Sequence, residues 1–140
     1  MPDLAADRDA IRDLLARYTY NGDRGRVDEL AACFAVGGVL EFPGGTGTGP
    51  QGVLVALTQR PRNPALKFVR HHITNPLITV TGDTASARSY FTVVSENGPD
   101  HSGTYDDMLV RGEQGWRFAH RRVRVDWQAA TSLFRTMTTR

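Results

Sequence analysis

The spacing of apolar residues predicts a helix near the start of the chain. One apolar stripe, at positions i, i+3, i+4 and i+7, consists of Ile11, Leu14, Leu15 and Tyr18. The positions off this stripe include Arg12, Asp13 and Arg17, as expected for a helix with one buried face. Asn21 and Gly22 follow, and both residue types tolerate the left-handed conformation in which helices often end. We therefore predict that this helix stops at Asn21 and Gly22.

A second apolar stripe predicts a second helix, which ends near Gly37 and Gly38. Its members are Val27, Leu30, Ala31 and Phe34. Residues 39–42 then indicate a short strand that is stopped by Pro43. The first part of the chain is therefore predicted to be mainly helical.

Residues 44–52 combine glycine with threonine and proline, and they predict a flexible loop that forms a lid or the rim of a cavity. The loop lacks the Lys-Ser/Thr ending of a phosphate-binding loop. Residues 53–57 predict a short helix, and Pro61 and Pro64 interrupt the chain after it.

The second half of the chain has the pattern of a sheet. The predicted strands, separated by turn sequences rich in Gly, Asn and Asp, are residues 68–80, 84–95, 101–111 and 116–127. Pro76 marks a bulge or an edge position in the first of them. Helices followed by an antiparallel meander predict an α+β fold in which the helices pack on one face of a curved, mainly antiparallel sheet. At 140 residues, the chain fits one domain, residues 1–140.

The last predicted strand changes its apolar face part of the way along. Trp116 and Phe118 share one face, whereas the other face carries Val123, Val125 and Trp127. A β-bulge near residues 119–121 would explain the change, and it would turn Arg121 inward together with Val123. The alternative is a regular strand without a bulge, which is buried first on one face and then on the other, with Arg121 exposed to solvent.

Composition and charge exclude several classes of protein. The sequence is 40% hydrophobic and 23% charged, which is ordinary for a soluble globular protein. A formal net charge of +2 gives no reason to expect a nucleic-acid partner. The first residues do not resemble a signal peptide, and no apolar run reaches the ~18–20 residues of a membrane span. Because Cys33 is the single cysteine and cannot form an internal disulfide, we expect a cytoplasmic protein.

Two adjacent histidines lie inside the strand predicted for residues 68–80. Side chains alternate along a strand, so His71 shares a face with Ile73, and His72 shares the other face with Thr74. An inward imidazole can serve as a general base near neutral pH. It can equally be a hydrogen-bonded core residue.

Four polar residues are candidates for one catalytic group: Tyr18, Asp23, His71 and Arg121. The Asp23 carboxylate would hydrogen-bond the His71 ring and stabilise its cation, although an N-cap of the second helix is an alternative role for Asp23. Tyr18 ends the first apolar stripe, so its hydroxyl could reach a pocket or could simply be packed in the core. Arg121 would supply a permanent positive charge.

Other catalytic patterns are missing from the sequence. It has no Gly-x-Ser-x-Gly motif and no dinucleotide-binding fingerprint. Cys33 lies beside an apolar stripe, which is a poor setting for a nucleophile. Adjacent histidines face opposite ways on a strand, and His101 and His120 are scattered, so we expect neither a metal site nor a cofactor.

Several short segments together resemble the SnoaL-like group of the nuclear transport factor-like superfamily. They are residues 14–18 (LLARY), 23–25 (DRG), 30–34 (LAACF), 70–75 (RHHITN), 103–105 (GTY) and 115–121 (GWRFAHR). The resemblance covers nearly the whole chain and implies a cone of curved sheet and helices with an internal pocket. The superfamily includes ketosteroid isomerases, scytalone and bile-acid dehydratases, a dehydrochlorinase, epoxide hydrolases, polyketide cyclases, dioxygenase small subunits and non-enzymatic binders.

The resemblance also implies roles for particular residues. Asp23 and His71 are similar in place to the Asp-His dyad of the dehydrochlorinase, and Arg121 resembles its pocket arginine. Tyr18 resembles the tyrosine that ketosteroid isomerases and bile-acid dehydratases carry on the first helix. Ketosteroid isomerases carry their aspartate base just before a proline, where this chain has Phe42, which argues against isomerisation by that route. The scytalone dehydratase pattern of two tyrosines and two histidines is matched only in part, by Tyr18 and His71.

These observations predict a cofactor-free lyase or isomerase that acts on a small apolar molecule of polycyclic or aromatic-precursor type. The residues expected to line its pocket are Phe34, Phe42, Phe91, Tyr105 and Val123. The alternatives are a non-catalytic small-molecule binder of the same fold and an accessory subunit of a ring-hydroxylating oxygenase. By analogy with such folds, we expect a homodimer or higher homo-oligomer formed through the open face of the sheet.

Overall fold

The computed structural model describes residues 3–137 and 139. In this part of the chain, helices and strands follow one another as α1 (Leu4–Asp23), α2 (Val27–Ala31), β1 (Phe34–Phe42), β2 (Gly45–Thr48), α3 (Gly49–Thr58), β3 (Val69–Thr81), β4 (Thr84–Ser95), β5 (Gly98–Gly112) and β6 (Gly115–Gln128). The strands form one sheet in the order β2-β1-β6-β5-β4-β3. Only the pair β1–β6 is parallel among them.

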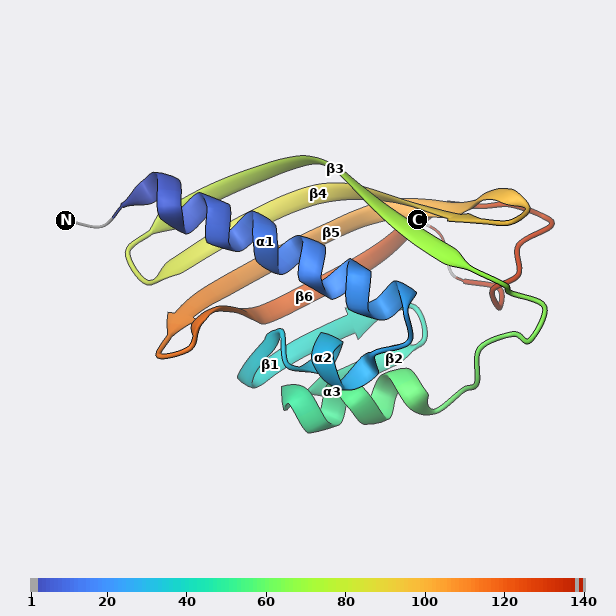
Figure 1. Cartoon of the computed structure of the whole chain (residues 1–140), viewed down its shortest axis with the longest axis horizontal. Helices are drawn as coiled ribbons and strands as arrows, with labels where there is room; N and C mark the ends of the chain where they lie inside the picture. The colour runs from blue at the N-terminus through green and yellow to red at the C-terminus, as the bar shows by residue number, and fades with distance from the viewer. Residues whose placement is uncertain (1–2, 138, 140) are drawn as a thin grey trace.

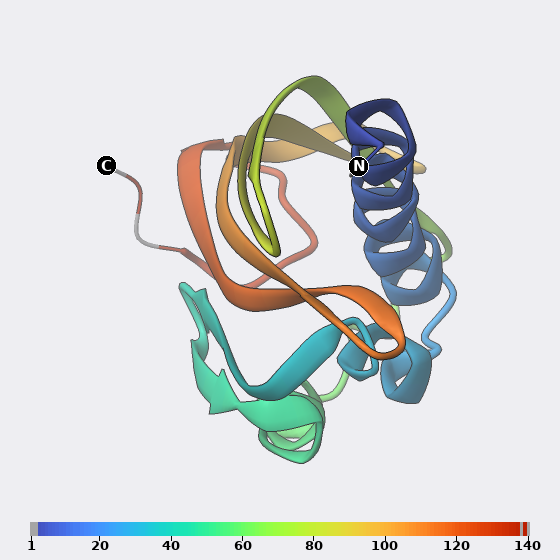
Figure 2. The same cartoon turned by 90° about the vertical axis from the view of Figure 1, so that its left-hand side faces the viewer.

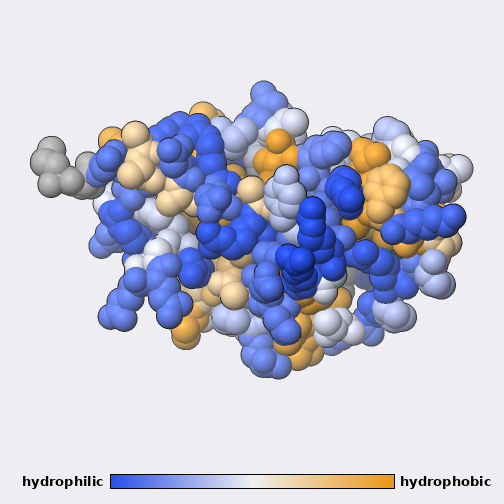
Figure 3. Space-filling model, viewed as in Figure 1, coloured by the Kyte–Doolittle hydropathy of each residue, from blue (hydrophilic) through white to orange (hydrophobic). Residues whose placement is uncertain are grey.

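Helix α1 crosses in front of the meander, and α2 and α3 lie beside β1 and β2 (Figure 1). The turned view shows how strongly the sheet curves (Figure 2). The predicted α+β fold with a curved, mainly antiparallel sheet is therefore confirmed. The face seen in Figure 3 is largely hydrophilic, with scattered apolar spots. Within the described residues, no helix combines the length and the apolar character that crossing a membrane requires.

Helix α1 is held at its first turn. The Asp3 carboxylate caps it by accepting a hydrogen bond from the Ala6 N–H at 3.1 Å. The Asp7 carboxylate accepts hydrogen bonds from Trp116 Nε1 at 3.2 Å and from the Arg111 guanidinium. These contacts fix the start of the helix to the turn between β5 and β6.

The predicted end of α1 was wrong, because the helix continues through Asn21 and Gly22 to Asp23. The left-handed residue that ends it is Gly25, with a φ of 71°. Arg26 N–H then donates to the Asn21 carbonyl at 2.8 Å and closes the turn.

The predicted second helix was wrong in its later part. Helix α2 ends at Ala31, and Phe34 already belongs to β1. Phe34 pairs in parallel with Phe118 of β6, and the Phe118 N–H donates to the Cys33 carbonyl at 2.8 Å. Pairing with a strand far along the chain thus overrides the local helical spacing.

The prediction of an irregular loop at residues 44–52 was wrong, although residues of this segment do line a cavity, which agrees with the predicted rim. β2 pairs with β1 there, and α3 begins at Gly49, so the short helix predicted at residues 53–57 is confirmed within α3. A Cβ atom at Gly47 would lie 2.5 Å from the Gly52 carbonyl oxygen. This glycine therefore permits the close approach of β2 and α3 rather than flexibility.

The four-stranded meander is confirmed, although β5 begins at Gly98, earlier than predicted. The pairing of β3 with β4 shifts between Thr74 and Leu77, which confirms a bulge around Pro76. Asn75, beside this proline, has a φ of 56°.

The bulge predicted in the last strand is confirmed as well. Leu109 of β5 lies opposite Phe118 and Met108 lies opposite His120, so Ala119 is the extra residue. The shift lets Phe118 and Arg121 both be buried. The alternative of a regular strand with Arg121 in solvent is wrong.

A buried ion pair lies at the centre of the inner face of the sheet. Arg121 is 0% exposed, and its Nε and Nη2 atoms donate to Asp107 Oδ1 and Oδ2 at 2.8 and 2.9 Å. Burial raises the pKa of Asp107, although Arg121 opposes this effect. Burial alone would lower the pKa of Arg121, but the Asp107 carboxylate outweighs it and raises that pKa. Because an arginine guanidinium stays protonated in proteins, the buried charge of Arg121 depends on Asp107 for its compensation.

Aromatic rings surround the guanidinium of Arg121. Its carbon atom lies 4.3 Å from the ring centre of Tyr18, 3.8 Å from that of Tyr105 and 4.3 Å from that of Phe118. Desolvated cation–π contacts of this kind stabilise the buried charge.

Removing one partner of this ion pair should be costly. We predict that Asp107→Ala lowers the free energy of unfolding by about 3–5 kcal/mol, because it leaves the Arg121 charge buried without compensation. Denaturant unfolding provides the measurement. The matched control is Asp106→Ala, which removes the neighbouring carboxylate from its ion pair with the exposed Arg88 and should cost less than about 1 kcal/mol. Equal losses in the two variants would contradict this account.

The glycine of the 103–105 segment should also be required for packing. A Cβ at Gly103 would lie 1.8 Å from the Arg124 carbonyl oxygen and 3.0 Å from Phe91 Cε1. We predict that Gly103→Ala destabilises the fold by at least about 1–3 kcal/mol. Gly112→Ala, on the same strand, is the control, since a Cβ there meets no atom within 4 Å. Thermal unfolding of both variants tests this, and similar midpoints would refute it.

Candidate active site

The ends of α1 and β3 meet through Asp23 and His71. Asp23 Oδ1 lies 2.6 Å from His71 Nδ1, and Asp23 Oδ2 accepts a hydrogen bond from the His71 backbone N–H at 3.0 Å. The hydrogen bond predicted between these side chains is thus confirmed. The alternative role of Asp23 is wrong, because Arg26 is the N-cap residue of α2.

This two-point contact determines which imidazole nitrogen is available. An ionised carboxylate only accepts hydrogen bonds, so Nδ1 carries the proton and Nε2 keeps its lone pair. Nε2 has no hydrogen-bond partner among the described residues. The Asp23 side chain is 5% exposed and that of His71 is 23% exposed. A molecule can therefore reach the imidazole, whereas its carboxylate partner is shielded.

His71 belongs to the inner face of the sheet, as the alternation of β3 predicts. His72, its neighbour, is exposed. Strand pairing places Val93 of β4 opposite His71 on one side and opposite His101 of β5 on the other. Two strand spacings separate the backbones of the two histidines by roughly 10 Å. The inner face thus carries two imidazoles in one row across the sheet.

A cluster of aromatic rings fills the inner face beside His71. Phe91 and Tyr105 stack with ring centres 4.5 Å apart, and the ring centre of Phe91 lies 6.4 Å from that of His71. Tyr18 contacts Tyr105 at 6.0 Å and Phe34 at 6.2 Å. Three of the predicted lining residues, Phe34, Phe91 and Tyr105, therefore belong to one cluster together with Tyr18.

Tyr18 and Arg121 come together, as predicted, and both side chains are buried. Burial raises the pKa of Tyr18, with Arg121 opposing the shift, so the phenol is neutral near pH 7 and can donate a hydrogen bond. Arg121 Nη1 is buried and has no hydrogen-bond partner within the described part of the chain. Asp107 binds the other two nitrogens of this guanidinium, Nε and Nη2, and leaves Nη1 able to bind an acceptor atom.

The sequence analysis missed Asp107, the partner of Arg121. Asp107 is in phase with Tyr105 and Leu109 on β5, and both of these are buried. That alternation places the Asp107 side chain inward. The signal was therefore present in the sequence, in the alternation of Tyr105, Asp107 and Leu109.

A second Asp-His pair also escaped the sequence analysis. His101 Nδ1 lies 2.7 Å from Asp100 Oδ1, and both side chains are buried. The register between β4 and β5 shifts at this point, because Val94 pairs with Pro99 and Val93 with His101. The bulge at Asp100 lets two consecutive side chains point inward. A regular strand would have separated them, so the sequence gave no direct signal.

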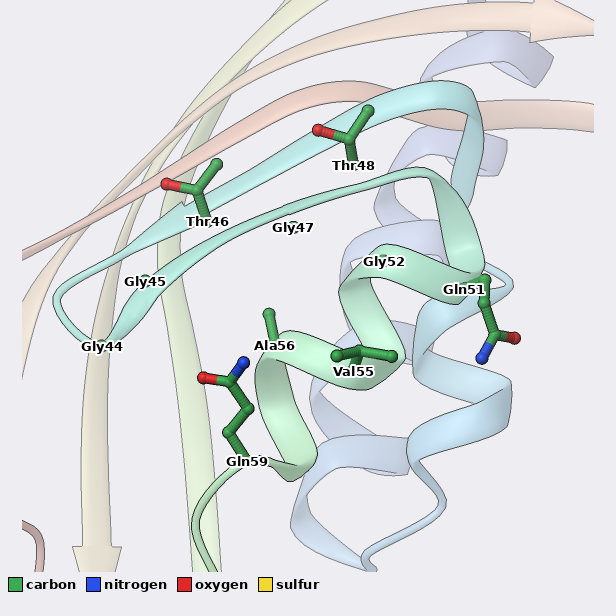
Figure 4. Close-up of a pocket in the computed structure, with 10 residues that line it drawn as sticks. All are labelled: Gly44, Gly45, Thr46, Gly47, Thr48, Gln51, Gly52, Val55, Ala56 and Gln59. Carbon is green, nitrogen blue, oxygen red and sulfur yellow. The ribbon is translucent and has the colours of Figure 1, made fainter.

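The other two predicted lining residues, Phe42 and Val123, lie at a surface cavity of about 640 Å³. The lining of this cavity consists of Glu41, Phe42, Pro43, Thr46, Arg122, Val123, Arg124, Val125 and Thr139. A smaller cavity of about 280 Å³ lies where β2 runs beside α3 (Figure 4). Neither cavity is lined by Asp23 or His71. The structure therefore divides the predicted pocket residues between the aromatic cluster and a surface cavity, although Val123 of that cavity pairs with Tyr105 of the cluster.

Potential metal ligands do not gather in the described part of the chain: no group of three His, Cys, Asp or Glu side chains is placed to hold an ion. Burial raises the pKa of the Cys33 thiol, which disfavours its reactive thiolate form. The acid–base groups that remain near the aromatic cluster are the two Asp-His pairs and Tyr18.

Solved structures share this arrangement of helices and sheet. Rv3472 from Mycobacterium tuberculosis, a protein of unknown function solved as a variant, is 30% identical; the match covers 86% of this chain and 72% of that chain, with a TM-score of 0.71. A protein of unknown function with a cystatin-like fold from Nostoc punctiforme is 28% identical over 90% of this chain and 96% of that one, with a TM-score of 0.75. An NTF2-like protein with a cystatin-like fold from Novosphingobium aromaticivorans is 26% identical over 95% and 92%, with a TM-score of 0.79.

No curated protein matches the sequence significantly. At the level of families, residues 3–122 match the SnoaL-like domain. The match includes α1, the Asp23–His71 contact, the meander and the bulge of β6. The chain therefore belongs to the SnoaL-like domain family.

Proposed function

We propose that this protein is a cofactor-free enzyme that removes an acidic C–H proton from a small apolar molecule of polycyclic or aromatic-precursor type. The observation that carries the proposal is the Asp23–His71 contact, which leaves Nε2 of an accessible imidazole with a free lone pair. Positioned imidazoles of this kind are the commonest general bases in enzymes.

The chemistry follows from the position of the protons. His71 Nε2 takes the proton of the C–H bond, and the bond's electron pair moves into a new C=C bond as a leaving group departs from the next carbon. Where that group is hydroxide, the imidazolium returns the proton and water leaves. In a rearrangement no group departs: the electron pair is delocalised over an adjacent unsaturated group, and the imidazolium returns the proton to another carbon. Asp23, 5% exposed, stabilises the imidazolium between the two steps.

The surroundings of His71 support an apolar, unsaturated substrate. The stacked rings of Phe91 and Tyr105 lie beside His71. The flat rings of a substrate would pack well against such aromatic faces. Negative charge that develops on the substrate would be met by the neutral Tyr18 hydroxyl and by the unpartnered Arg121 Nη1.

One observation favours a second candidate, a protein that binds small molecules without turnover. The cavity of about 640 Å³ at Phe42 and Val123 is large enough for a small ligand, yet it does not include His71 among its lining residues. A ligand bound there would not touch the base. The experiment below separates the two candidates.

We predict that His71→Ala lowers the turnover of a substrate by about 10²- to 10⁴-fold, the usual contribution of a positioned base. Asp23→Asn should also slow turnover, because an amide cannot stabilise the imidazolium. The control is His72→Ala, which removes the exposed imidazole on the other face of β3 and should leave the rate unchanged. Ultraviolet spectra of hydroxylated polycyclic compounds, recorded with the parent protein and the three variants in parallel, provide the measurement.

Equal rates in the parent and in His71→Ala would remove His71 from the mechanism. The binder predicts a different result: a compound titrates the parent protein to saturation but is not converted, and both variants of the dyad bind it nearly as well. Thermal unfolding of each variant shows whether a lost rate reflects lost folding.

A further inference from the structure

The chain after β6 forms a strap across one end of the sheet. We call residues 129–137 the C-terminal strap; it lies outside the SnoaL-like match, which ends at residue 122. The strap contains no helix or strand. Figure 1 shows it in red at the end of the sheet where β4 turns into β5. Its position is therefore set mainly by side-chain contacts rather than by regular pairing.

Asp100 provides the first of these contacts. Its Oδ1 accepts a hydrogen bond from Ser132 Oγ at 2.7 Å, and its Oδ2 accepts one from the Leu133 N–H at 2.8 Å. Burial alone would raise the pKa of Asp100, but the hydrogen bonds from Ser132, His101 and Leu133 outweigh it and lower that pKa. The carboxylate is thus ionised near neutral pH and binds the strap through charge-assisted hydrogen bonds.

A backbone hydrogen bond from the Ala129 N–H to the Asp100 carbonyl at 2.8 Å also joins the strap to β5, and two side-chain amides make further contacts. Gln128, the last residue of β6, donates from Nε2 to Ser132 Oγ at 3.0 Å and to the Arg135 carbonyl at 2.9 Å. Its Oε1 accepts a hydrogen bond from the Met137 N–H at 2.9 Å. Asn63, in the connection between α3 and β3, donates to the Leu133 carbonyl at 3.0 Å. The strap is therefore held at both ends and in its middle.

The strap carries an aromatic ring onto the second imidazole of the inner face. The ring centre of Phe134 lies 4.8 Å from that of His101. His101 in turn lies 6.0 Å from Phe91, the ring that contacts His71. The His101 side chain is only 6% exposed, although Phe134 itself is only partly buried. The strap, whose Phe134 ring is only partly buried, thus covers the first in a row of three neighbouring rings, those of His101, Phe91 and His71.

A molecule of the size of two fused rings needs a route to the His101 end of this row, because the His101 side chain is only 6% exposed. Neither described cavity is lined by His71 or His101. The other elements around the row are paired strands and α1, and these open only with much of the fold. The strap has no backbone ladder, and its apolar side chains Leu133, Phe134 and Met137 are only partly buried against the core, so its local opening costs least.

We propose that the C-terminal strap is a latched cover over the His101 end of the inner face. Release of the hydrogen bonds from Ser132 and Leu133 to Asp100 lifts Phe134 off His101 and opens the route by which small apolar molecules reach the imidazole of His101 and the ring of Phe91 beside it. Only the fate of such a molecule at His71 rests on the proposed function. The opening itself does not.

The test uses diethyl pyrocarbonate, a small reagent that acylates neutral imidazole nitrogens, with the full-length protein and no substrate. Burial lowers the pKa of His101, although Asp100 opposes the shift, so its ring is neutral at pH 7 and reacts once it is reached. Peptide mass spectrometry gives a rate for each histidine, and the exposed His72 serves as the internal reference. In the parent protein, His101 should react far more slowly than His72.

Two variants loosen the cover in different ways. Ser132→Ala removes the hydroxyl that binds Asp100 and should raise the rate at His101 about tenfold or more, because a hydrogen bond to a charged group is lost. Phe134→Ala should raise it as well by uncovering the ring. The matched controls are Thr131→Ala, which removes an exposed hydroxyl of the same strap, and Phe68→Ala, which removes a phenyl ring from the surface. Both controls should leave the rate unchanged.

The proposal is overturned if His101 in the parent reacts as fast as His72. It is also overturned if Ser132→Ala and Phe134→Ala react at His101 within about twofold of their controls, a difference too small for the loss of a charge-assisted hydrogen bond. Amide hydrogen exchange gives a second reading: the Leu133 and Met137 amides should exchange together and well before the amides of β5. Absence of turnover would count against the proposed function only, since neither reading needs a substrate.

Discussion

The two-point contact of Asp23 with His71 is the interaction on which the site depends. One carboxylate oxygen holds the backbone of β3 and the other holds the imidazole ring, so the same side chain fixes the helix and orients the base. The helix is tied at its other end as well, where Asp7 binds Trp116 and Arg111. Because α1 is anchored at both ends, its apolar stripe covers the inner face of the sheet. Because Asp23 binds Nδ1, the neutral His71 ring has one preferred tautomer.

The inner face of the sheet is divided by its buried ion pair. On one side of Arg121 and Asp107, Phe118 and Leu109 are fully packed. On the other side, the rings of Tyr105 and Phe91 lead towards the two histidines. Arg121 thus has two functions in this account: it stabilises the aromatic cluster through its three ring contacts, and it leaves Nη1 to meet an acceptor. The end of the inner face that carries the two histidines is therefore the part where acid–base chemistry is possible.

Local patterns predicted the parts of the fold that depend on local preferences. The helical stripe of α1, the alternation of the meander strands and the phase change in β6 each reflect one face of an element packing on the core. The position of His71 and its contact with Asp23 followed from such alternation together with family resemblance.

Long-range pairing explains most of what the sequence did not reveal. Phe34 has helical spacing to Leu30 and Ala31, yet its pairing with Phe118 places it in β1. The glycines of residues 44–52 suggested a flexible loop, but they allow β2 and α3 to approach closely. The pair of Asp100 and His101 depends on a bulge that is defined only by the register with β4. Each of these features is fixed by a partner far along the chain, which local spacing cannot specify.

The tautomer of His71 tests the central claim most directly. Nitrogen NMR of the protein labelled at its histidine rings reports which ring nitrogen carries the proton in the neutral state. The account predicts that His71 carries it on Nδ1, held by Asp23, and that Nε2 shows the signal of a nitrogen with a free lone pair. A proton on Nε2, or the mixture of tautomers found in free histidine, would contradict the assignment of His71 as a base oriented by Asp23.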